Sequence, residues 1–257
     1  AEAAGVADRI SIVETVTPDL LKAVDLVTNT GHLRPINAEM INSLPSQAVI
    51  ALMFEAWEFR ATDIDLEASR RRGIPVVGVN EQHPSIDVFS YLGPLCVKLL
   101  HDAGFAVYGN RIALLCDNGF AKPMVRGLVG SGANVSHFTT VEALPSDLWD
   151  AIVVALKPAA EPRVGEREAG HIASAVTGGA TVAQFWGDVD REALARHDLR
   201  AWPPSAPRTG HMAILLSAIG PDAIVRLQAG GLRAAEWVFR GNAATRESVA
   251  QLVEVQN

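Results

Sequence analysis

The residues best placed to do chemistry follow a buried strand within Arg111–Val135, which reads as strand, tight turn, helix and second strand. A dinucleotide-binding unit carries G-x-G-x-x-G at such a turn. The first glycine permits the turn, the second lets the backbone approach a pyrophosphate, and the third position packs helix on strand. Here the turn is Cys116-Asp117-Asn118-Gly119-Phe120-Ala121, and only Ala121 meets its requirement. The scaffold is typical of a nucleotide binder, whereas the site is not.

Three side chains of this turn are unfavourable for the binding of a dinucleotide. Cys116 and Asn118 fill space that the phosphates need, and Asp117 adds a negative charge beside them. If a dinucleotide binds, Asn118 and Gly119 would be among its contacts. Cys116 itself ends a core strand, so it is either a nucleophile or, as such cysteines more often are, a small buried hydrophobic residue.

A second group of polar residues follows another apolar strand. Glu55, Glu58 and Arg60 lie in the segment FEAWEFR after the strand Ala48–Phe54. Ligands of parallel α/β sheets bind beyond the carboxyl ends of the strands, so these three residues are candidates for substrate binding. Surface ion pairing is the alternative. His32 and Arg34 also follow a strand end, and no His or Cys spacing resembles a metal site.

Strands alternate with helices along the whole chain, which predicts an α/β protein with parallel sheets. In the first half the expected strands are Ile10–Glu14, Leu26–Asn29, Ala48–Phe54 and Pro75–Val79, and the expected helices are Pro18–Val24, Asn37–Leu44, Leu66–Arg72 and about 85–103. In the second half the expected strands are Arg111–Cys116, Asn134–Phe138, Ala151–Leu156, Thr181–Phe185 and Leu199–Trp202. The expected helices there are about 122–129, 166–176, 191–197 and 212–239.

Gly104 separates the two series, and this break predicts two domains. We expect a flavodoxin-like substrate or catalytic domain over residues 1–103, completed by the C-terminal helix at about 225–257. A Rossmann-like, doubly wound parallel sheet of the nucleotide-binding type should occupy residues 104–224.

The composition of the chain indicates which kinds of binding partner and which compartment to expect. The net charge of -7 argues against binding a phosphate backbone, so we expect no nucleic acid. The apolar runs have the length of strands, so we expect no membrane span. Two cysteines give no disulfide framework and fit a reducing cytoplasm.

Several segments in order resemble the D-isomer-specific 2-hydroxyacid dehydrogenases, the group of glycerate, formate and phosphoglycerate dehydrogenases. Asp63–Ala68 followed by Arg72–Val76 is similar to that family's D-x-I-D-x-x-A…G-I-x-V stretch. Asp150–Pro158 resembles its strand that ends in a proline beside the cofactor. Gly179–Leu194 resembles its G-A-x-x-x-N-x-x-R-G-x-x-V-D-x-x-A-L segment, and Thr209-Gly210-His211 resembles its T-P-H segment.

The resemblance implies a set of catalytic and cofactor residues, and one of four is intact. His211 stands where the family has its general acid/base. Trp186 stands where an arginine clamps the substrate carboxylate, and an indole has one donor and no charge. Thr139 stands where an aspartate binds the ribose, and Leu199–Pro207 holds no carboxylate to orient the histidine. Trp186 could stack on a flat ligand or plug the vacated cofactor groove.

Three hypotheses follow. The favoured one is a dehydrogenase-like protein with eroded NAD and catalytic sites, which uses its interdomain cleft for a small polar molecule without hydride transfer and without a cofactor. The second is an NAD- or NADP-dependent oxidoreductase with an altered substrate. In it Ser136, His137, Thr139 and Thr140 hold a 2′-phosphate, and Arg60 or Arg34 replaces the clamp. The third is a noncatalytic homodimer whose interface includes the helix at about 85–103. A homodimer is expected in any case.

Overall fold

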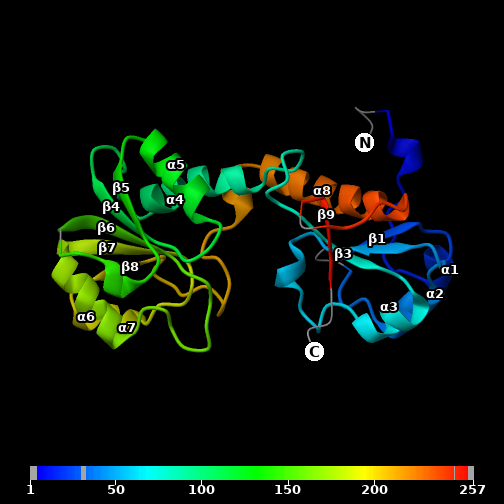
Figure 1. The fold of residues 1–257 in the computed structure, drawn as a ribbon, viewed down its shortest axis with the longest axis horizontal. Helices are drawn as coiled ribbons and strands as arrows, with labels where there is room; N and C mark the ends of the chain where they lie inside the picture. The colour runs from blue at the N-terminus through cyan, green and yellow to red at the C-terminus, as the bar shows by residue number, and fades with distance from the viewer. Residues whose placement is uncertain (1–4, 30–32, 147, 246, 254–257) are drawn as a thin grey trace. The chain divides into compact units, whose positions relative to one another are not determined.

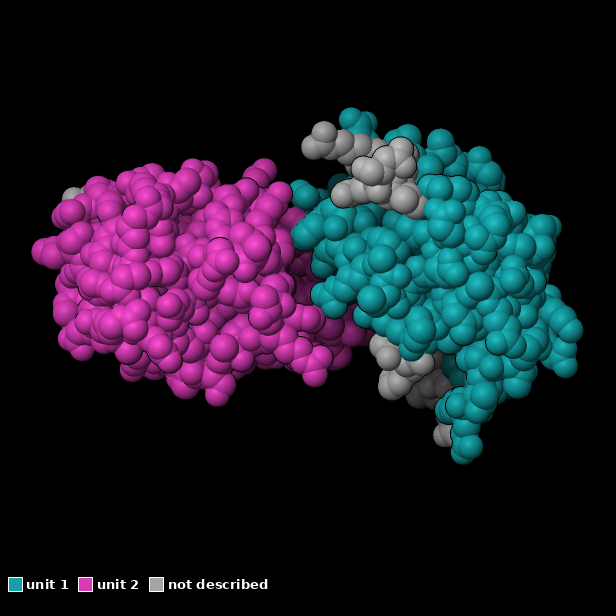
Figure 2. Space-filling model, turned by 90° about the horizontal axis from the view of Figure 1, so that it is seen from below, with its two compact units in different colours: residues 1–86, 226–257 teal, residues 87–225 magenta. Residues whose placement is uncertain are grey.

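The structure is a computed structural model that describes all residues except 1–4, 30–32, 147, 246 and 254–257. The chain forms two compact units. Unit 1 comprises residues 1–86 and 226–257, and unit 2 comprises residues 87–225 (Figure 2). Both are mixed α/β units built on largely parallel sheets.

Unit 1 is built on a four-stranded sheet in the order β1-β2-β3-β9. The strands β1 (Leu26–Thr28), β2 (Val49–Ala51) and β3 (Val76–Val79) run parallel, and β9 (Ala250–Leu252) joins β3 antiparallel. The helices α1 (Pro18–Leu21), α2 (Ala38–Ser43) and α3 (Leu66–Arg72) cover one face, and α8 (Asp222–Phe239) covers the other (Figure 1). Leu21, Ile41 and Ala68 join β2 residues in the core beneath the first three helices.

The helices of unit 1 begin at residues that sequence rules favour. Asn37 and Asp65 cap α2 and α3, because their side chains accept hydrogen bonds from the backbone N–H groups of Met40 and Ala68 at 3.0 and 2.8 Å. Gly73 ends α3 in the left-handed conformation, with φ of 67°.

The predicted strand Ile10–Glu14 is wrong. A short 3₁₀ turn, η2 (Ala7–Arg9), precedes it, and residues 10–14 pair with no strand among the described residues. Ile12 is 96% exposed and Ile10 is 53% exposed, so the apolar residues of this segment have no core to cover. The alternation in the sequence alone could not show this.

Unit 2 is a five-stranded parallel sheet in the order β5-β4-β6-β7-β8. The strands are β4 (Arg111–Leu115), β5 (Asn134–Phe138), β6 (Trp149–Ala155), β7 (Val176–Trp186) and β8 (Arg200–Trp202). The helices α4 (Leu92–Asp102) and α5 (Ala121–Gly130) pack on one face, and α6 (Glu166–Ala175) and α7 (Arg191–Arg196) pack on the other (Figure 1). Short 3₁₀ turns are η3 (Ala56–Glu58) in unit 1, and η4 (Phe89–Tyr91), η5 (Val141–Ala143) and η6 (Leu216–Ile219) in unit 2.

The helix expected at about 85–103 differs from the prediction in extent and in the unit to which it belongs. It begins with η4 and becomes regular only at Leu92, and it lies in unit 2, so the units divide at 86/87 and not at 103/104. Gly93 in α4 and Gly127 in α5 allow these two helices to pack closely, because a Cβ on Gly127 would lie 2.4 Å from Gly93 Cα. The two helix backbones therefore meet directly, and Leu95, Cys96, Leu99 and Leu100 are buried in the core of unit 2.

The helical stretch expected at about 212–239 is also interrupted. It comprises η6, a break at Gly220 with φ of 110°, and then α8. Gly231 brings α8 onto the sheet of unit 1, since a Cβ there would lie 2.8 Å from Leu52 O. The edge strand β9 that follows was not predicted. None of the described helices combines the length and apolar character that a membrane crossing requires.

Candidate functional site

The carboxyl ends of β1, β2 and β3 carry the polar side chains of unit 1. The residues that follow these strands are Asn29, Met53 to Glu55, and Asn80 with Glu81. Asn29 is fully buried, and its Oδ1 accepts a hydrogen bond from Met53 N at 3.0 Å, which ties the ends of β1 and β2 together. Because the three strands are parallel, these residues share one edge of the sheet, where α/β sheets hold their ligands.

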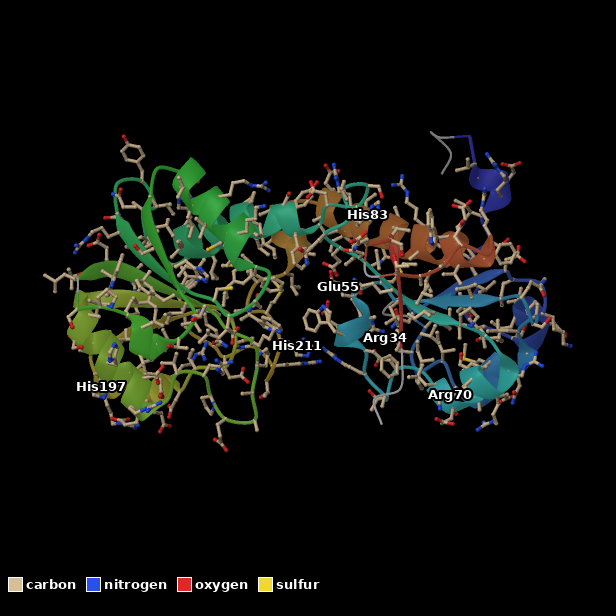
Figure 3. All side chains as sticks on the ribbon, in the orientation of Figure 1. Arg34, Glu55, Arg70, His83, His197 and His211 are labelled. Atoms are coloured by element: carbon tan, nitrogen blue, oxygen red, sulfur yellow. The ribbon has the colours of Figure 1, made fainter. Side chains whose placement is uncertain are left out.

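Glu55 is the most buried acidic residue at this edge. Glu55 is 5% exposed, and its Oε2 accepts a hydrogen bond from Trp57 Nε1 at 2.5 Å. Oε1 has no hydrogen-bond partner among the described residues. A buried carboxylate oxygen without a donor is costly, so this atom calls for an added group or a proton. Figure 3 labels Glu55 on the segment after β2.

Glu58 and Glu81 interact electrostatically with Glu55. Desolvation and then the charge of Glu55 raise the pKa of Glu58 to about 7, against lowering effects of the Glu55 backbone N–H and of Arg60. Desolvation and the charges of Glu58 and Glu55 raise the pKa of Glu81 well above its usual range. Burial likewise raises the pKa of Glu55, while Trp57 and the backbone of Glu81 lower it. We call Glu55, Glu58 and Glu81 the carboxylate cluster.

Two contacts hold the loop of the carboxylate cluster on the sheet. Gly78 in β3 lies so close to η3 that a Cβ on it would meet Ala56 N at 2.3 Å. Gln251 of β9 accepts a hydrogen bond from the same Ala56 N at 3.1 Å through Oε1. The glycine and the edge strand thereby bring Glu55 and Glu58 from the end of β2 beside Glu81 at the end of β3.

Arg34 lies at the same edge and is already engaged. Its Nε donates to Asn29 O at 3.0 Å, its Nη1 lies 3.4 Å from Asp63 Oδ2, and its guanidinium carbon lies 5.5 Å from the centre of the Phe54 ring. These contacts favour a structural role for Arg34 over the substitute clamp of the oxidoreductase hypothesis. His32 lies outside the described residues.

In unit 2 the turn after β4 is closed by its own side chains. Asn118 Nδ2 donates to Ala155 O at the end of β6 at 2.7 Å, and Asn118 Oδ1 accepts from Phe120 N at 3.0 Å. Asp117 Oδ1 accepts from Lys157 N at 2.7 Å, and Asp117 Oδ2 pairs with Arg163 Nη1 at 3.1 Å. The backbone donors at this strand end are thus partly used within the protein.

The Asp117 carboxylate is held in its charged form. Desolvation raises its pKa, but the hydrogen bonds from Lys157 N, Asn118 and Arg163 and the charge of Arg163 together lower it below the usual value of an aspartate. Asp117 is therefore ionised at neutral pH, and a phosphate brought to this turn would face that negative charge.

Trp186 and Phe120 fill the space beside this turn. Their ring centres lie 5.1 Å apart, and Trp186 is 8% exposed within the core of unit 2. Trp186 Nε1 donates to Gly210 O at 3.0 Å. The indole is therefore packed against the N-terminus of α5, which favours the interpretation of Trp186 as a plug.

The remaining predicted site residues of unit 2 fall into two groups. Cys116 is fully buried, and desolvation raises the pKa of its thiol to about 11, so it is protonated at neutral pH and behaves as a buried hydrophobic residue. Gly119, Thr139 and His211 are exposed. His211 lies in the loop before η6, with its backbone N–H bonded to Arg208 O at 2.9 Å (Figure 3).

The predicted residues divide between the units. Glu55, Glu58 and Arg60 lie in unit 1, and Cys116, Asn118, Trp186 and His211 lie in unit 2. That they face one shared cleft stays a prediction. Among the described residues, no group of three or more His, Cys, Asp or Glu side chains has an arrangement that could hold a metal ion.

Sequence reasoning missed Glu81, Phe120 and Arg163. Glu81 could have been found, since it follows Asn80 just beyond the end of the predicted strand Pro75–Val79. Arg163 gave no such signal, because it lies 46 residues from its partner Asp117.

Comparison with known proteins establishes the fold. No family model matches the sequence, and no curated protein matches it. Among solved structures, the chain is similar to one from Polaromonas assigned as a D-isomer specific 2-hydroxyacid dehydrogenase, NAD-binding, with a TM-score of 0.58 and 15% identity over 94% of this chain and 93% of that one. The NAD-dependent formate dehydrogenase of Staphylococcus aureus, solved with NAD, gives a TM-score of 0.55 and 14% identity over 88% and 84%. The dipicolinate synthase A chain of Bacillus subtilis gives a TM-score of 0.59 and 12% identity over 86% and 80%.

The chain therefore has the two-domain, Rossmann-like fold of the D-isomer-specific 2-hydroxyacid dehydrogenases. The expected resemblance is confirmed at the level of the fold. Since a dipicolinate synthase chain is among the similar structures, the fold by itself does not determine the reaction.

Proposed function

We propose that this protein uses the 2-hydroxyacid dehydrogenase fold to bind, or act on, a small polar molecule without hydride transfer and without a dinucleotide. The observation that carries the proposal is the closed turn after β4. Asn118 bridges this turn to Ala155 O at 2.7 Å, and Asp117 receives both Lys157 N and Arg163.

A pyrophosphate site needs backbone N–H groups that are free to donate and a backbone that the phosphates can approach. In this turn Phe120 N already donates to Asn118 Oδ1 at 3.0 Å, and Lys157 N donates to Asp117 Oδ1 at 2.7 Å. A bound dinucleotide would have to displace these bonds and approach an ionised carboxylate. Loss of the bond to the charged Asp117 costs about 1.5–3 kcal/mol, and loss of the bond to the neutral Asn118 costs about 0.5–1.5 kcal/mol.

The redox residues support the same proposal. The position that the resemblance gives to the substrate-clamping arginine holds Trp186, whose indole N–H is bonded to Gly210 O. His211 keeps the position of the acid/base, and its ring is exposed. A histidine in this position can accept and donate a proton in a reaction that needs no cofactor.

One observation favours an NAD- or NADP-dependent oxidoreductase as the second candidate. Similar structures were solved with NAD bound, including the formate dehydrogenase of Staphylococcus aureus. The groups proposed for a 2′-phosphate are less free than this candidate needs, because His137 Nε2 lies 2.7 Å from Cys116 O and the two are hydrogen-bonded.

The third hypothesis, a noncatalytic homodimer with the helix at about 85–103 in its interface, is less favoured. Its proposed interface used the apolar helix that the structure buries as α4 in unit 2. We retain a homodimer, a cytoplasmic location and a small-molecule partner as parts of the proposal. Light scattering of the purified protein measures the oligomeric state directly.

A cofactor titration tests the proposed function. NADH and NADPH are added to the protein in a calorimeter, with the Staphylococcus aureus formate dehydrogenase as the positive control for NADH. We expect dissociation constants weaker than about millimolar, corresponding to roughly 4 kcal/mol of binding free energy or less. Micromolar binding of either nucleotide would contradict the proposal and favour the oxidoreductase.

A further inference from the structure

A pocket of about 640 Å³ lies within unit 1, between the C-terminal half of α8 and two loops. The first loop follows β3 and contains His83 and Ser85, and the second loop joins α8 to β9 and contains Asn242 and Val249. Figure 3 labels His83 on the first loop beside α8. Among the residues that the structure describes, the lining includes none of the carboxylate cluster and none of the turn after β4, so this pocket is separate from the candidate site described above.

Hydrogen bonds join the walls of the pocket to one another. Asn80 N and Nδ2, at the end of β3, donate to Val249 O at 2.9 Å and to Ser248 O at 3.1 Å, which ties the first loop to the second. Trp237 Nε1 donates to Ala243 O at 2.8 Å, which ties α8 to the second loop. The pocket is therefore formed by the protein's own contacts, before any ligand binds.

Ser85 brings a guanidinium group and an imidazole ring together in this pocket. Arg233 Nη1 donates to Ser85 O at 3.0 Å, and His83 Nδ1 lies 2.8 Å from Ser85 Oγ and accepts from Ser85 N at 3.3 Å. Because Nδ1 accepts from a backbone N–H, the proton of the neutral ring lies on Nε2. His83 Nε2 and the Nε and Nη2 groups of Arg233 donate to none of the described residues. These donors are therefore open to an acceptor from outside the protein.

The charge of Arg233 is not neutralised by any carboxylate among the described residues. Its hydrogen bond goes to Ser85 O, which is a neutral acceptor. Arg240 also lines the pocket, but its Nη2 lies 2.6 Å from Glu236 Oε1, so this arginine already has an acidic partner. Glu247 lines the pocket from the second loop and forms no ion pair with the described residues. An anionic ligand at Arg233 would therefore gain a charge-assisted, bidentate pair with a guanidinium that the described part of the protein leaves without one.

Trp237 supplies an aromatic wall next to Arg233. Residues four apart in a helix are neighbours on its surface, so the two side chains emerge side by side from α8. The bond to Ala243 O holds the indole, and Trp237 is 40% exposed, so part of its ring is open to the pocket. A flat apolar body can stack on this ring while its acidic group meets the guanidinium one helical turn away.

We propose that this pocket binds a small aromatic carboxylate, with the carboxylate on Arg233 and His83 Nε2 and the aromatic ring on Trp237. The proposal goes beyond the proposed function, because it adds a second ligand site that lies within unit 1 and uses none of the residues of the first. Arg233 selects the sign of the ligand's charge, and Trp237 selects its flat shape.

Phenylacetate, added to the full chain, is the probe, and the indole N–H signals of the ¹⁵N-labelled protein report where it binds. The chain has five tryptophans, and Trp237→Phe identifies the signal of Trp237 by its loss. We expect phenylacetate to shift this signal with a dissociation constant of about millimolar or tighter. Cyclohexylacetate has the same charge without an aromatic ring and should bind about fivefold more weakly. Benzylamine has the ring with the opposite charge and should leave the signal unchanged.

Variants at Arg233 and His83 test the two donors. Arg233→Gln removes the charge from an exposed side chain and should weaken phenylacetate about tenfold or more, as expected for a charge-assisted hydrogen bond. Arg233→Lys keeps the charge without the planar fork and should weaken it less than Arg233→Gln does. His83→Ala removes Nε2 and should weaken it about threefold. Arg71→Gln, on an exposed arginine of α3 in the same unit, is the matched control and should bind as the parent protein does.

The proposal is overturned if phenylacetate leaves the Trp237 signal unchanged, if benzylamine shifts it as strongly as phenylacetate does, or if Arg233→Gln and Arg71→Gln bind phenylacetate alike. If Arg233→Gln does not fold, His83→Ala decides, and equal binding by His83→Ala and Arg71→Gln then overturns the proposal. These outcomes are independent of the nucleotide titration. Weak NADH binding together with no effect of phenylacetate would leave the proposed function standing and remove only this inference.

Discussion

Arg163 Nη1 lies 3.1 Å from Asp117 Oδ2, which places a cation of the protein itself at the turn where similar folds hold a phosphate. The same Nη1 donates to Lys157 O at 2.6 Å, so Arg163 joins the end of β4 to the segment after β6. Both side chains are about one quarter exposed, at 27% and 24%. The pair thus ties the turn after β4 to the segment after β6 within unit 2.

The ionised form of Asp117 should stabilise unit 2 in a pH-dependent way. The folded state lowers the pKa of Asp117 from its usual value, so the contribution of its charge to stability is present above the pKa of the unfolded state and is lost as the pH falls through the folded pKa. Asp117→Asn should therefore be destabilised relative to the parent protein at about pH 6, and the difference should shrink towards about pH 3. Urea unfolding at each pH, followed by circular dichroism, measures this difference.

Glu192→Gln is a suitable control for this comparison, because Glu192 is an exposed residue of α7 in the same unit. Its stability should stay close to that of the parent protein at both pH values. An Asp117→Asn variant whose destabilisation is equal at about pH 6 and about pH 3 would show that the loss comes from geometry and not from charge.

Both cysteines should be unreactive in the folded protein. Burial raises the pKa of the Cys116 thiol to about 11 and that of Cys96 above its usual range, and the thiolate is the species that reacts. Iodoacetamide at about pH 8 should label neither residue in the native protein and both in urea. Rapid native labelling of Cys116, located by mass spectrometry, would restore the nucleophile hypothesis.

The contact between α4 and α5 should depend on glycine at one position and tolerate a side chain at a nearby one. A Cβ at Gly127 would lie 2.4 Å from Gly93 Cα, so Gly127→Ala should destabilise the protein by about 1–3 kcal/mol through overpacking. Gly130, in the same helix, has nothing within 4 Å of its added Cβ. Gly130→Ala should therefore be neutral or stabilising by up to ~1 kcal/mol. Similar urea midpoints for the two variants would show that the helices can separate without cost.

Local sequence signals predicted most of the regular elements. Asp65, the run Leu66–Arg72 and Gly73 carry a complete set of start, helix and stop signals, and α3 has those bounds in the structure. Non-local features were not visible. The packing of α4 on α5 and of α8 on the sheet of unit 1 involves close approaches at Gly93, Gly127 and Gly231. Each approach joins segments far apart in the chain.

For the candidate site as well, the sequence predicted where some of the residues lie but not the contacts that they make. The rule that ligands lie beyond strand ends selected Glu55 and Glu58, and the missing glycines singled out the turn at Asn118. The rule could not predict which side chains bind to Asp117 and to Glu55. Asp117 pairs with Arg163 and Trp57 donates to Glu55, and these contacts arise only when the loops pack. Burial decided between the two interpretations of Cys116, and burial follows from the tertiary fold.

Trp186 and His211 should respond to substitution in opposite ways, because one is packed and the other is exposed. Trp186 is 8% exposed, lies with its ring centre 5.1 Å from that of Phe120 and donates to Gly210 O, so Trp186→Ala should cost about 3–5 kcal/mol. Trp186→Phe keeps the ring contact and loses the hydrogen bond, so it should cost about 1 kcal/mol. His211→Gln should change stability by less than about 0.5 kcal/mol, as for an ordinary exposed residue.

Urea unfolding followed by circular dichroism measures the stability of all three variants. A large loss of stability in His211→Gln would make His211 a structural residue and remove it as the proposed proton carrier, whereas an unchanged midpoint in Trp186→Ala would show that the indole does not plug the groove.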